Sequence, residues 1–243
     1  MTFCIIPARL NSSRFPAKLL AQAGGKTVLQ RTFEQALLCF ENQNIFIATD
    51  NEQIETHMRP LGGQVIRTSS SCQNGTQRII EALRNTAALK EAKIIVNLQG
   101  DHPTIHPDTV RAAIQLLEND PQAVMSTAAA PLRNETDFFS PHVVKVVLDQ
   151  HANALYFSRA PIPYTKAKMP SGALQHIGLY CFRSSFLLEL DSLAKSPLCE
   201  SEDLEQLKAL EAGYRIKVAL VDEPALGIDT PDDLTKLEKL LCR

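Results

Sequence analysis

Short apolar runs alternate with amphipathic stretches along the first part of the chain. Residues 3–7 (FCIIP), 44–50 (NIFIATD) and 64–68 (QVIRT) are compact and apolar, which predicts buried strands. Residues 28–40 carry apolar side chains at helical spacing with polar ones opposite, which predicts a helix. A second helix is predicted over 51–63, where two glycines end the pattern. The predicted order is therefore strand, helix, strand, helix, strand.

The same alternation continues to about residue 129. A helix is predicted after Gly75, a strand over 93–99 (KIIVNLQ), a helix from Pro107 and a strand over 123–129 (AVMSTAA). Strands that alternate with helices form a mostly parallel sheet with helices on both faces. The sequence therefore predicts an α/β fold.

The loops that follow three of the predicted strands are the places where we expect chemistry. In open α/β sheets, ligands bind outside the carboxyl ends of the strands. By that rule the candidate loops are residues 8–18, 68–76 and 99–106.

The pattern changes between residues 142 and 182. Extended segments over 143–149, 154–159 and 174–182 flank a polar stretch that contains prolines, which predicts an inserted sheet or arm. We expect one main domain over residues 1–243, with this insertion at about 133–185.

A helical pattern returns after the insertion. Ser201 is a suitable N-cap, Glu202 and Asp203 suit the first turn, and Gly213 can end the helix. A further strand is predicted over 215–221.

The last predicted helix has a clear start. Thr230 is its predicted N-cap and Pro231 its first residue, an arrangement that suits the fixed backbone angle of proline. Leu234, Leu237 and Leu241 are expected to face inward because they recur at helical spacing.

Composition narrows the class of protein. Hydrophobic residues make up 44% of the chain and charged residues 21%, and the net charge of -2 gives no bulk attraction to nucleic acid or membranes. An anionic substrate must therefore be held by local charge. No apolar run is long enough to span a membrane, and Arg9 and Arg14 interrupt the N-terminal apolar stretch, so we expect a cytoplasmic protein. The scattered cysteines include no CxxC pair, which favours reduced thiols over structural zinc.

Three cations lie in the loop after the first predicted strand. Arg9, Arg14 and Lys18 are concentrated where a triphosphate needs positive charge. An arginine grips phosphate oxygens in a bidentate way, whereas a lysine acts as a mobile point charge. The alternative is that all three are ordinary solvated surface charges.

Two common nucleotide-binding motifs are not met. A Walker A loop would end at Gly25, Lys26 and Thr27, but Leu20 stands where its first glycine is required. The dinucleotide fingerprint GxGxxG does not occur, so a dehydrogenase is disfavoured, and Asp50 is interpreted as a cap of the following helix.

Two aspartates are candidate magnesium ligands. Asp101 directly follows a predicted buried strand and Gly100, and Asp229 precedes the last helix. Each has a structural alternative: Asp101 as a turn residue and Asp229 as part of a normal helix start. Only convergence in space decides between these interpretations.

Two further polar groups are weaker candidates. Gly75 lets backbone amides approach a base or phosphate, and Arg78 adds charge on the first helical turn, although Arg78 is equally interpretable as a surface residue. A second set suits a polyhydroxylated acid, with an arginine for the carboxylate and polar groups for the hydroxyls. Its members are Ser158, Arg159, His176, Tyr180, Glu205 and Gln206.

Ordered motifs along nearly the whole chain carry a family resemblance. They are IIPARLNSSRFPAKLL, ATD, NGTQR, NLQGDHP, VKVVLD, ALYFSRAPIP, HIGLY, EDLEQLKALEAG and GIDTPDDL. In this order and spacing they resemble the 3-deoxy-manno-octulosonate (KDO) cytidylyltransferases, also called CMP-KDO synthetases.

The resemblance implies a Rossmann-like nucleotidyltransferase fold and a homodimer formed partly through the inserted region. It implies Mg²⁺-dependent transfer of CMP from CTP to the anomeric hydroxyl of KDO, with release of pyrophosphate, for lipopolysaccharide synthesis. No covalent enzyme intermediate is expected.

The resemblance also implies roles for individual residues. Asp101 and Asp229 are the expected metal ligands, and Arg9, Lys18 and Asp101 the expected catalytic residues. The expected nucleotide-binding residues are Pro7, Arg9, Arg14, Lys18, Asn74, Gly75, Arg78 and Gln99. The expected sugar-binding residues are Ser158, Arg159, His176, Tyr180, Glu205 and Gln206.

The sequence departs from the family pattern at five positions. Ala17 and Leu19 replace the usual glycine and proline around Lys18, Gln77 and His102 replace acids, and Cys181 replaces a small residue. These departures leave open a cytidylyltransferase for another acidic sugar, such as 8-amino-KDO or a sialic acid. They also leave open a catalytically silent sugar-nucleotide-binding protein.

Overall fold

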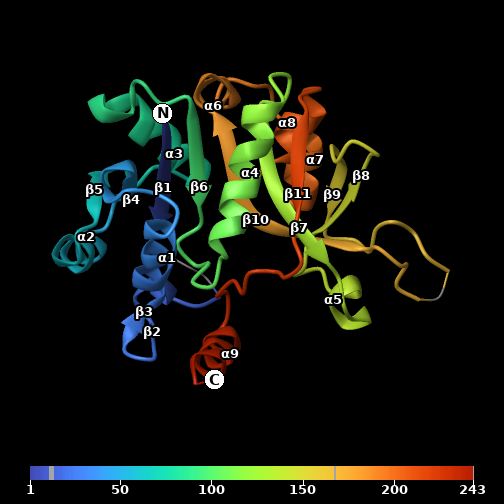
Figure 1. The fold of residues 1–243 in the computed structure, drawn as a ribbon, viewed down its shortest axis with the longest axis horizontal. Coiled ribbons are helices and arrows are strands. Elements are labelled where there is room, and N and C mark those ends of the chain that lie inside the picture. Colours follow the sequence, from blue (N-terminus) through green and yellow to red (C-terminus); the bar gives the residue numbers. More distant parts are fainter. Residues whose placement is uncertain (11–13, 167, 243) are drawn as a thin grey trace. The chain divides into compact units, whose positions relative to one another are not determined.

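The computed structural model describes residues 1–10, 14–166 and 168–242 of the chain. The chain divides into two compact units, Met1–Val110 with Ala225–Arg243, and Arg111–Pro224. Figure 1 allows the elements of each unit to be followed by their labels.

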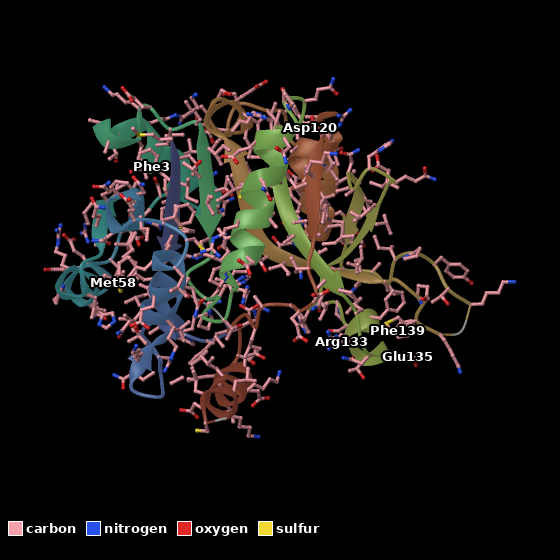
Figure 2. All side chains as sticks on the ribbon, viewed as in Figure 1. Phe3, Met58, Asp120, Arg133, Glu135 and Phe139 are labelled. Carbon is pink, nitrogen blue, oxygen red and sulfur yellow. The ribbon has the colours of Figure 1, made fainter. Side chains whose placement is uncertain are left out.

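A parallel sheet forms the centre of the first unit. Its strand order is β6-β1-β4-β5, and all three neighbouring pairs are parallel. The strands are β1 (Thr2–Ala8), β4 (Ile45–Thr49), β5 (Gln64–Arg67) and β6 (Ile94–Leu98). The interior of β1 and all of β4 and β6 are buried, as expected for near-continuous apolar strands covered on both faces. Phe3 on β1 and Met58 on α2, both labelled in Figure 2, belong to this core.

Helices follow the strands of the first unit. The α-helices are α1 (Val28–Leu37), α2 (Glu52–Met58), α3 (Gly75–Asn85) and α9 (Pro231–Leu241), and α4 (Pro107–Asn119) begins in this unit. Short 3-10 helices lie at η1 (Lys18–Leu20), η2 (Asn42–Asn44), η3 (Arg59–Leu61) and η4 (Ala87–Leu89).

Side-chain caps fix where these helices begin. Thr27 accepts a hydrogen bond from the Gln30 amide at the start of α1, and Asn74 accepts one from the Gln77 amide at the start of α3. Each cap satisfies a backbone N–H that has no partner within its own helix. Because the Asn74 side chain caps α3, the backbone of the loop is fixed where it enters that helix.

Gly25, Lys26 and Thr27, which resemble the end of a Walker A loop, belong to a hairpin instead. Residues Gln22–Ala23 and Lys26–Thr27 form a small hairpin, β2 and β3, which sequence analysis did not predict. Gly24 and Gly25 both have positive φ angles, 55° and 76°, which a two-residue hairpin turn requires and glycine adopts without strain.

The second unit is built on a mixed sheet. Strand β7 (Met125–Pro131) is parallel to β11 (Ile216–Leu220) and antiparallel to β10 (Leu174–Arg183). Strand β8 (Lys145–Leu148) pairs with β10 and with β9 (Ala154–Ser158). The helices of this unit are α5 (Glu135–Phe139), α6 (Ser184–Leu190), α7 (Pro197–Glu202) and α8 (Leu207–Glu211). The prediction of extended segments between residues 142 and 182 is confirmed.

The region around α5 has a small core of its own. Leu132, Phe138 and Ala173 are buried together, with Val143 and Met169 packed against them. Phe139 is labelled beside α5 in Figure 2, and 48% of its surface is exposed. The proposed insertion at about 133–185 thus combines strands with one short helix.

Two predictions about the C-terminal helices are wrong. No helix begins at Ser201: Ser196 and Pro197 form a stronger N-terminal signal, so α7 begins at Pro197 and Glu202 is its last residue. Asp203 then adopts a left-handed conformation that ends the helix. In α9, Leu237 is buried as predicted, but Leu241 is 42% exposed because the last turn extends beyond the core.

Within the described part of the chain, no helix is long and apolar enough to cross a membrane.

Candidate nucleotide and sugar sites

A cavity of about 680 Å³ opens at the carboxyl ends of β1 and β6 in the first unit. Its walls include the predicted metal ligands and every predicted nucleotide-binding residue except Asn74, which instead caps α3. The candidate residues on its walls are Pro7, Arg9, Arg14, Lys18, Gly75, Arg78, Gln99, Asp101 and Asp229. The three candidate loops therefore contribute to one cavity, as the rule for α/β sheets predicts.

Lys18 joins the two predicted metal ligands. Its Nζ donates to Asp101 Oδ2 over 2.5 Å and to Asp229 Oδ1 over 2.8 Å. Only 13% of the Lys18 side chain and 23% of the Asp101 side chain are exposed, against 47% for Asp229. Arg14 Nη2 lies 3.2 Å from the other Asp229 oxygen. Two carboxylates and two cations thus form one cluster.

The charges of this cluster stabilise one another. Burial lowers the pKa of Lys18, but attraction to Asp101 and hydrogen bonds to both aspartates outweigh it and raise that pKa above its usual value. Burial likewise raises the pKa of Asp101, yet interactions with His102 and Lys18 hold it below its usual range. Both groups are therefore charged at neutral pH.

Backbone hydrogen bonds bring Asp229 to Asp101. The Ile228 amide donates to the Asp101 carbonyl over 2.9 Å, and the Leu226 amide donates to Thr104 Oγ1 over 2.8 Å. The segment before α9 is thereby fastened to the loop after β6. Asp101 and Asp229, far apart in the sequence, therefore converge in space.

The helix start after Asp229 is capped by other residues. Thr230 and Asp233 form a capping box, and Asp233 Oδ2 accepts hydrogen bonds from the Asp229 and Thr230 amides. The Asp229 carboxylate is therefore left to Lys18 and Arg14 rather than used as a cap.

Gly100 is needed where the loop after β6 meets β1. A Cβ at this position would lie 3.2 Å from the Pro7 carbonyl oxygen and 3.3 Å from Leu29 Cδ1. Leu19, one of the departures from the family pattern, packs 3.4 Å from the same point and is buried. The absence of a side chain at Gly100 lets Asp101 reach the cavity.

Arg78 and Asp50 are structurally coupled. Arg78 is only 2% exposed, so the interpretation of it as a surface residue is wrong. Its Nη1 donates to Thr68 Oγ1 over 2.5 Å and its Nη2 lies 3.4 Å from Asp50 Oδ2. Asp50 is not the cap of α2, because the Asn51 side chain accepts from the first amides of that helix.

Polar contacts hold the remaining walls of the cavity. Arg9 Nη1 donates to the Gln73 carbonyl over 2.8 Å, and Gln99 Nε2 donates to Asn97 Oδ1 over 2.8 Å. A Cβ on Gly75 would lie 3.2 Å from Pro7 Cγ. The start of α3 therefore approaches β1 closely.

The structure describes the surroundings of three departures from the family pattern. Ala17 has φ 55° and ψ 23°, a left-handed conformation that glycine adopts freely and that costs an alanine about 1 kcal/mol. Gln77 Oε1 accepts from the Gln73 amide over 2.8 Å, the hydrogen bond that a carboxylate would accept at the same place. For His102, burial lowers the imidazole pKa, so the side chain beside Asp101 is neutral at pH 7.

The predicted sugar-binding residues lie in the second unit. Ser158 and Arg159 follow one another at the end of β9, and His176 and Tyr180 lie on β10. Tyr180 OH donates to Gln206 Oε1 over 3.0 Å, and the His176 and Tyr180 rings lie 5.4 Å apart. Burial raises the pKa of Tyr180, so its hydroxyl stays protonated and is able to donate.

Thr127 determines which nitrogen of His176 carries a proton. The Thr127 hydroxyl donates to the Leu179 carbonyl over 2.6 Å, so its oxygen accepts from His176 Nε2 over 2.8 Å. Thr127 is fully buried. The sequence does not identify it as a site residue, because a threonine is common in an apolar strand.

Glu202 and Lys145 are also missing from the predicted set. Glu202 contacts Ser158 and Arg159, and Lys145 is fully buried with its ammonium bonded to the Arg159 carbonyl over 2.6 Å. The sequence could have indicated Lys145, because a single lysine inside the apolar run VVKVV must be bonded to polar groups if it is buried. Glu202 was predicted in the first turn of a helix starting at Ser201, but it is the last residue of α7, and the next helix, α8, begins only at Leu207.

The donor set suits magnesium. Among the described residues, no three His, Cys, Asp or Glu side chains are grouped to hold a metal ion, but Asp101 and Asp229 supply two carboxylates in one cavity. Magnesium in phosphate-transfer sites is bound through one or two carboxylates plus substrate phosphates. The two aspartates therefore fit that ion, although they do not form a complete cage.

Parallel strands that end at a cationic cavity with two carboxylates form an arrangement suited to nucleotidyl transfer. The sequence profile of the family described as cytidylyltransferase matches residues 3–216. A solved structure of CMP:2-keto-3-deoxy-manno-octonic acid synthetase complexed with CTP is 34% identical, with a TM-score of 0.90, and the match covers 99% of this chain and 98% of the other.

Two relatives of known name narrow the class further. The 3-deoxy-manno-octulosonate cytidylyltransferase of Protochlamydia amoebophila is 48% identical over 98% of this chain and 93% of its own length. The protein of the same name from Arabidopsis thaliana, described as mitochondrial, is 45% identical over 98% of this chain and 82% of its own length. The chain belongs to the 3-deoxy-manno-octulosonate cytidylyltransferase family, as its motifs predict.

Proposed function

We propose that this protein transfers CMP from CTP to the anomeric hydroxyl of KDO, forming CMP-KDO and pyrophosphate. One observation carries the proposal: Lys18, Asp101 and Asp229 converge in a cavity lined by further cations, in a chain similar to these cytidylyltransferases over almost its full length. The reaction class needs this combination, because a triphosphate requires cations and its metal requires carboxylates.

The cations of the loop after β1 are the proposed triphosphate grip. Arg9, Arg14 and Lys18 line the same cavity, and Arg14 and Lys18 both contact Asp229. Lys18 is mostly buried, so its attraction to a phosphate oxygen is little weakened by water. We assign Pro7, Gly75, Arg78 and Gln99 to the nucleoside side, where the Arg78 charge is already paired with Asp50.

Asp101 and Asp229 are the proposed magnesium ligands. When bound, magnesium neutralises phosphate charge and favours ionisation of the attacking hydroxyl. The contribution of the protein is to hold both carboxylates in one cavity, each bonded to the Lys18 ammonium.

The polar residues of the second unit are the proposed sugar site. Arg159 is the proposed partner of the sugar carboxylate, and His176, Tyr180, Glu205 and Gln206 are the proposed partners of its hydroxyls. The buried Ser158 and Gln206 support this assignment, because buried polar side chains in a shared cluster have fixed orientations.

The proposed reaction is a single displacement. The anomeric oxygen of KDO forms a bond to the α-phosphorus of CTP, and the bond from that phosphorus to the bridging oxygen of the β-phosphate breaks. Pyrophosphate leaves with the electron pair, and the hydroxyl proton passes to solvent. Catalysis of this kind rests on positioning and charge neutralisation.

A homodimer is also proposed, with contacts through residues 133–185. Three large apolar or aromatic side chains of this region are exposed: Phe139 at 48%, Leu155 at 62% and Tyr164 at 85%. Solvent contact with such side chains favours their burial against a second copy. A sedimentation measurement that finds only monomer at micromolar concentration would exclude the dimer.

We further propose that the protein acts in the cytoplasm.

A substrate panel tests the function. CTP, UTP, ATP and GTP are each combined with KDO, 8-amino-KDO or sialic acid, and pyrophosphate release is followed with and without Mg²⁺. We expect release only with CTP, Mg²⁺ and an acidic sugar together, and fastest with KDO. Faster turnover of another sugar would redirect the assignment to that sugar. If CTP binds the folded protein but no pair turns over, the protein is a silent sugar-nucleotide-binding protein and the enzyme proposal fails.

A further inference from the structure

We propose that Glu202 is a positioning residue that holds together the two segments of the sugar site, the end of β9 and the turn between α7 and α8. The inference deepens the proposed function and rests on it. Glu202 is the first residue of the motif EDLEQLKALEAG, but the predicted sugar-binding set does not include it.

The Glu202 carboxylate is fully engaged with the end of β9. Oε1 accepts from Ser158 Oγ over 2.5 Å, and Oε2 accepts from the Arg159 amide over 2.8 Å. Tyr156 OH lies at 3.5 Å from Oε1, at the limit of a hydrogen bond. One carboxylate therefore fixes both the hydroxyl of Ser158 and the backbone of Arg159.

The backbone of the same turn holds the Arg159 guanidinium. Nε donates to the Glu202 carbonyl over 2.7 Å, Nη2 donates to the Asp203 carbonyl over 3.2 Å, and Nη1 donates to the Pro141 carbonyl over 3.2 Å. A guanidinium has five N–H donors, so two remain for a ligand carboxylate. The side chain is 35% exposed, and its Nη2 also lies 3.6 Å from the exposed Asp203 carboxylate.

Glu202 also determines where the following turn begins. It is the last residue of α7, and Asp203 leaves the helix with φ 53°. The Leu204 amide closes the turn on the Cys199 carbonyl over 3.3 Å, and the chain then presents Glu205 and Gln206, the latter bonded to Tyr180. A shift of Glu202 would therefore disturb both Arg159 and the turn that leads to Gln206.

Lys145 also contacts the end of β9. Its ammonium donates to the carbonyls of Ser140, Val143 and Arg159 over 2.8, 2.6 and 2.6 Å. Burial lowers the pKa of Lys145, while the charge of Glu202 opposes that shift. The carbonyl of Arg159 is thus bonded to Lys145 and its amide to Glu202, which leaves little freedom at this residue.

Variants of Glu202 test the proposal. Glu202→Ala removes both acceptors, whereas Glu202→Gln keeps one and turns an NH₂ group toward a donor. Glu200→Ala is the matched control, because Glu200 is exposed on the same helix. For each protein, the KM for KDO and the KM for CTP are measured separately, together with kcat, the melting temperature and KDO binding by calorimetry.

We expect Glu202→Ala to raise the KM for KDO at least tenfold, Glu202→Gln to raise it by less, and the KM for CTP to stay within twofold in both. Glu200→Ala should match the parent protein. Equal increases in both KM values, or a KDO affinity unchanged by Glu202→Ala, would overturn the positioning role. A parent protein that neither binds nor turns over KDO would overturn the proposed function instead, and this inference with it.

Discussion

The Lys18 ammonium is bonded to Asp101 and, over a slightly longer distance, to Asp229, so one cation links two carboxylates from distant parts of the sequence. Two like charges close together are unfavourable unless a cation lies between them. In this protein the cation is part of the chain. The geometry that suits a metal is therefore maintained by a side chain that is itself assigned to the triphosphate.

Asp101→Asn tests the proposed metal site. The amide keeps the volume of the side chain and can still accept from Lys18, but it lacks the charge that binds magnesium. We expect turnover to fall at least 10²-fold at saturating Mg²⁺, with a melting temperature close to that of the parent. Asp108→Asn, on the exposed start of α4, should leave turnover unchanged. Near-normal activity of Asp101→Asn would remove Asp101 from the metal site.

Asp229 and Asp233 are expected to separate activity from stability. Asp233 belongs to the capping box of α9, whereas the Asp229 side chain contacts Lys18 and Arg14. Asp229→Asn should abolish turnover with little loss of stability. Asp233→Ala should lower the free energy of unfolding by about 1 kcal/mol, the usual value of a cap, and retain most activity. Urea unfolding and pyrophosphate release measure the two effects, and the reverse pattern would contradict these assignments.

Lys18→Met is expected to change the response to metal in the absence of nucleotide. Removing the ammonium leaves two carboxylates without their shared cation, which should destabilise the fold by about 1–3 kcal/mol. Added Mg²⁺ should then raise the melting temperature of the variant more than that of the parent, since the ion replaces the lost charge. Turnover should fall by about 10²-fold or more, because one donor to the triphosphate is lost.

A surface lysine provides the control for that measurement. Lys26 pairs with Glu34 on an exposed part of the first unit, where both side chains are well solvated. Lys26→Met should leave the metal response and turnover unchanged, and its effect on stability should stay below about 1 kcal/mol. If Mg²⁺ shifts the Lys18→Met and Lys26→Met variants equally, the two carboxylates do not bind the ion.

Cys181 predicts a loss of stability in alkaline solution. Burial raises the pKa of its thiol from 9.0 to about 12, so the folded protein keeps the proton that the unfolded chain loses. The resulting stability is fully present below pH 9 and declines as the pH rises toward 12. Urea unfolding at pH 7, 9 and 10 should show this decline, and Cys181→Ala should flatten it. An unchanged slope in the variant would contradict the assignment.

The sequence predicts the fold well where periodicity is local. Among the described strands, all but β2 and β3 overlap a predicted segment, because buried strands are short apolar runs that need no tertiary information to detect. The helix placed at Ser201 was wrong because Asp203 leaves the helical conformation, and tertiary bonds from Arg159 to that turn stabilise the break. The pattern of apolar and polar residues does not predict such tertiary hydrogen bonds.

The sequence predicts which residues line the candidate cavity, but not the contacts between them. The loops that follow parallel strands identified Lys18 and Asp101, whereas the approach of Asp229 depends on backbone bonds across the fold, such as that between Ile228 and Asp101. Glu202 escaped detection because its role depends on where a helix ends. Residues that bind a ligand through charge are visible in sequence, and residues that hold others in place mostly are not.

The capping box at the start of α9 has a consequence for how mutations in this protein would behave in a cell. Since Thr230 and Asp233 hold the helix without help from Asp229, a chain that loses the Asp229 carboxylate keeps its fold and escapes the quality control that removes unfolded chains. Mutation at this position would therefore yield protein of normal abundance without activity, still able to join intact copies in the proposed homodimer. Its defect would be found by assaying activity and missed by measuring protein level.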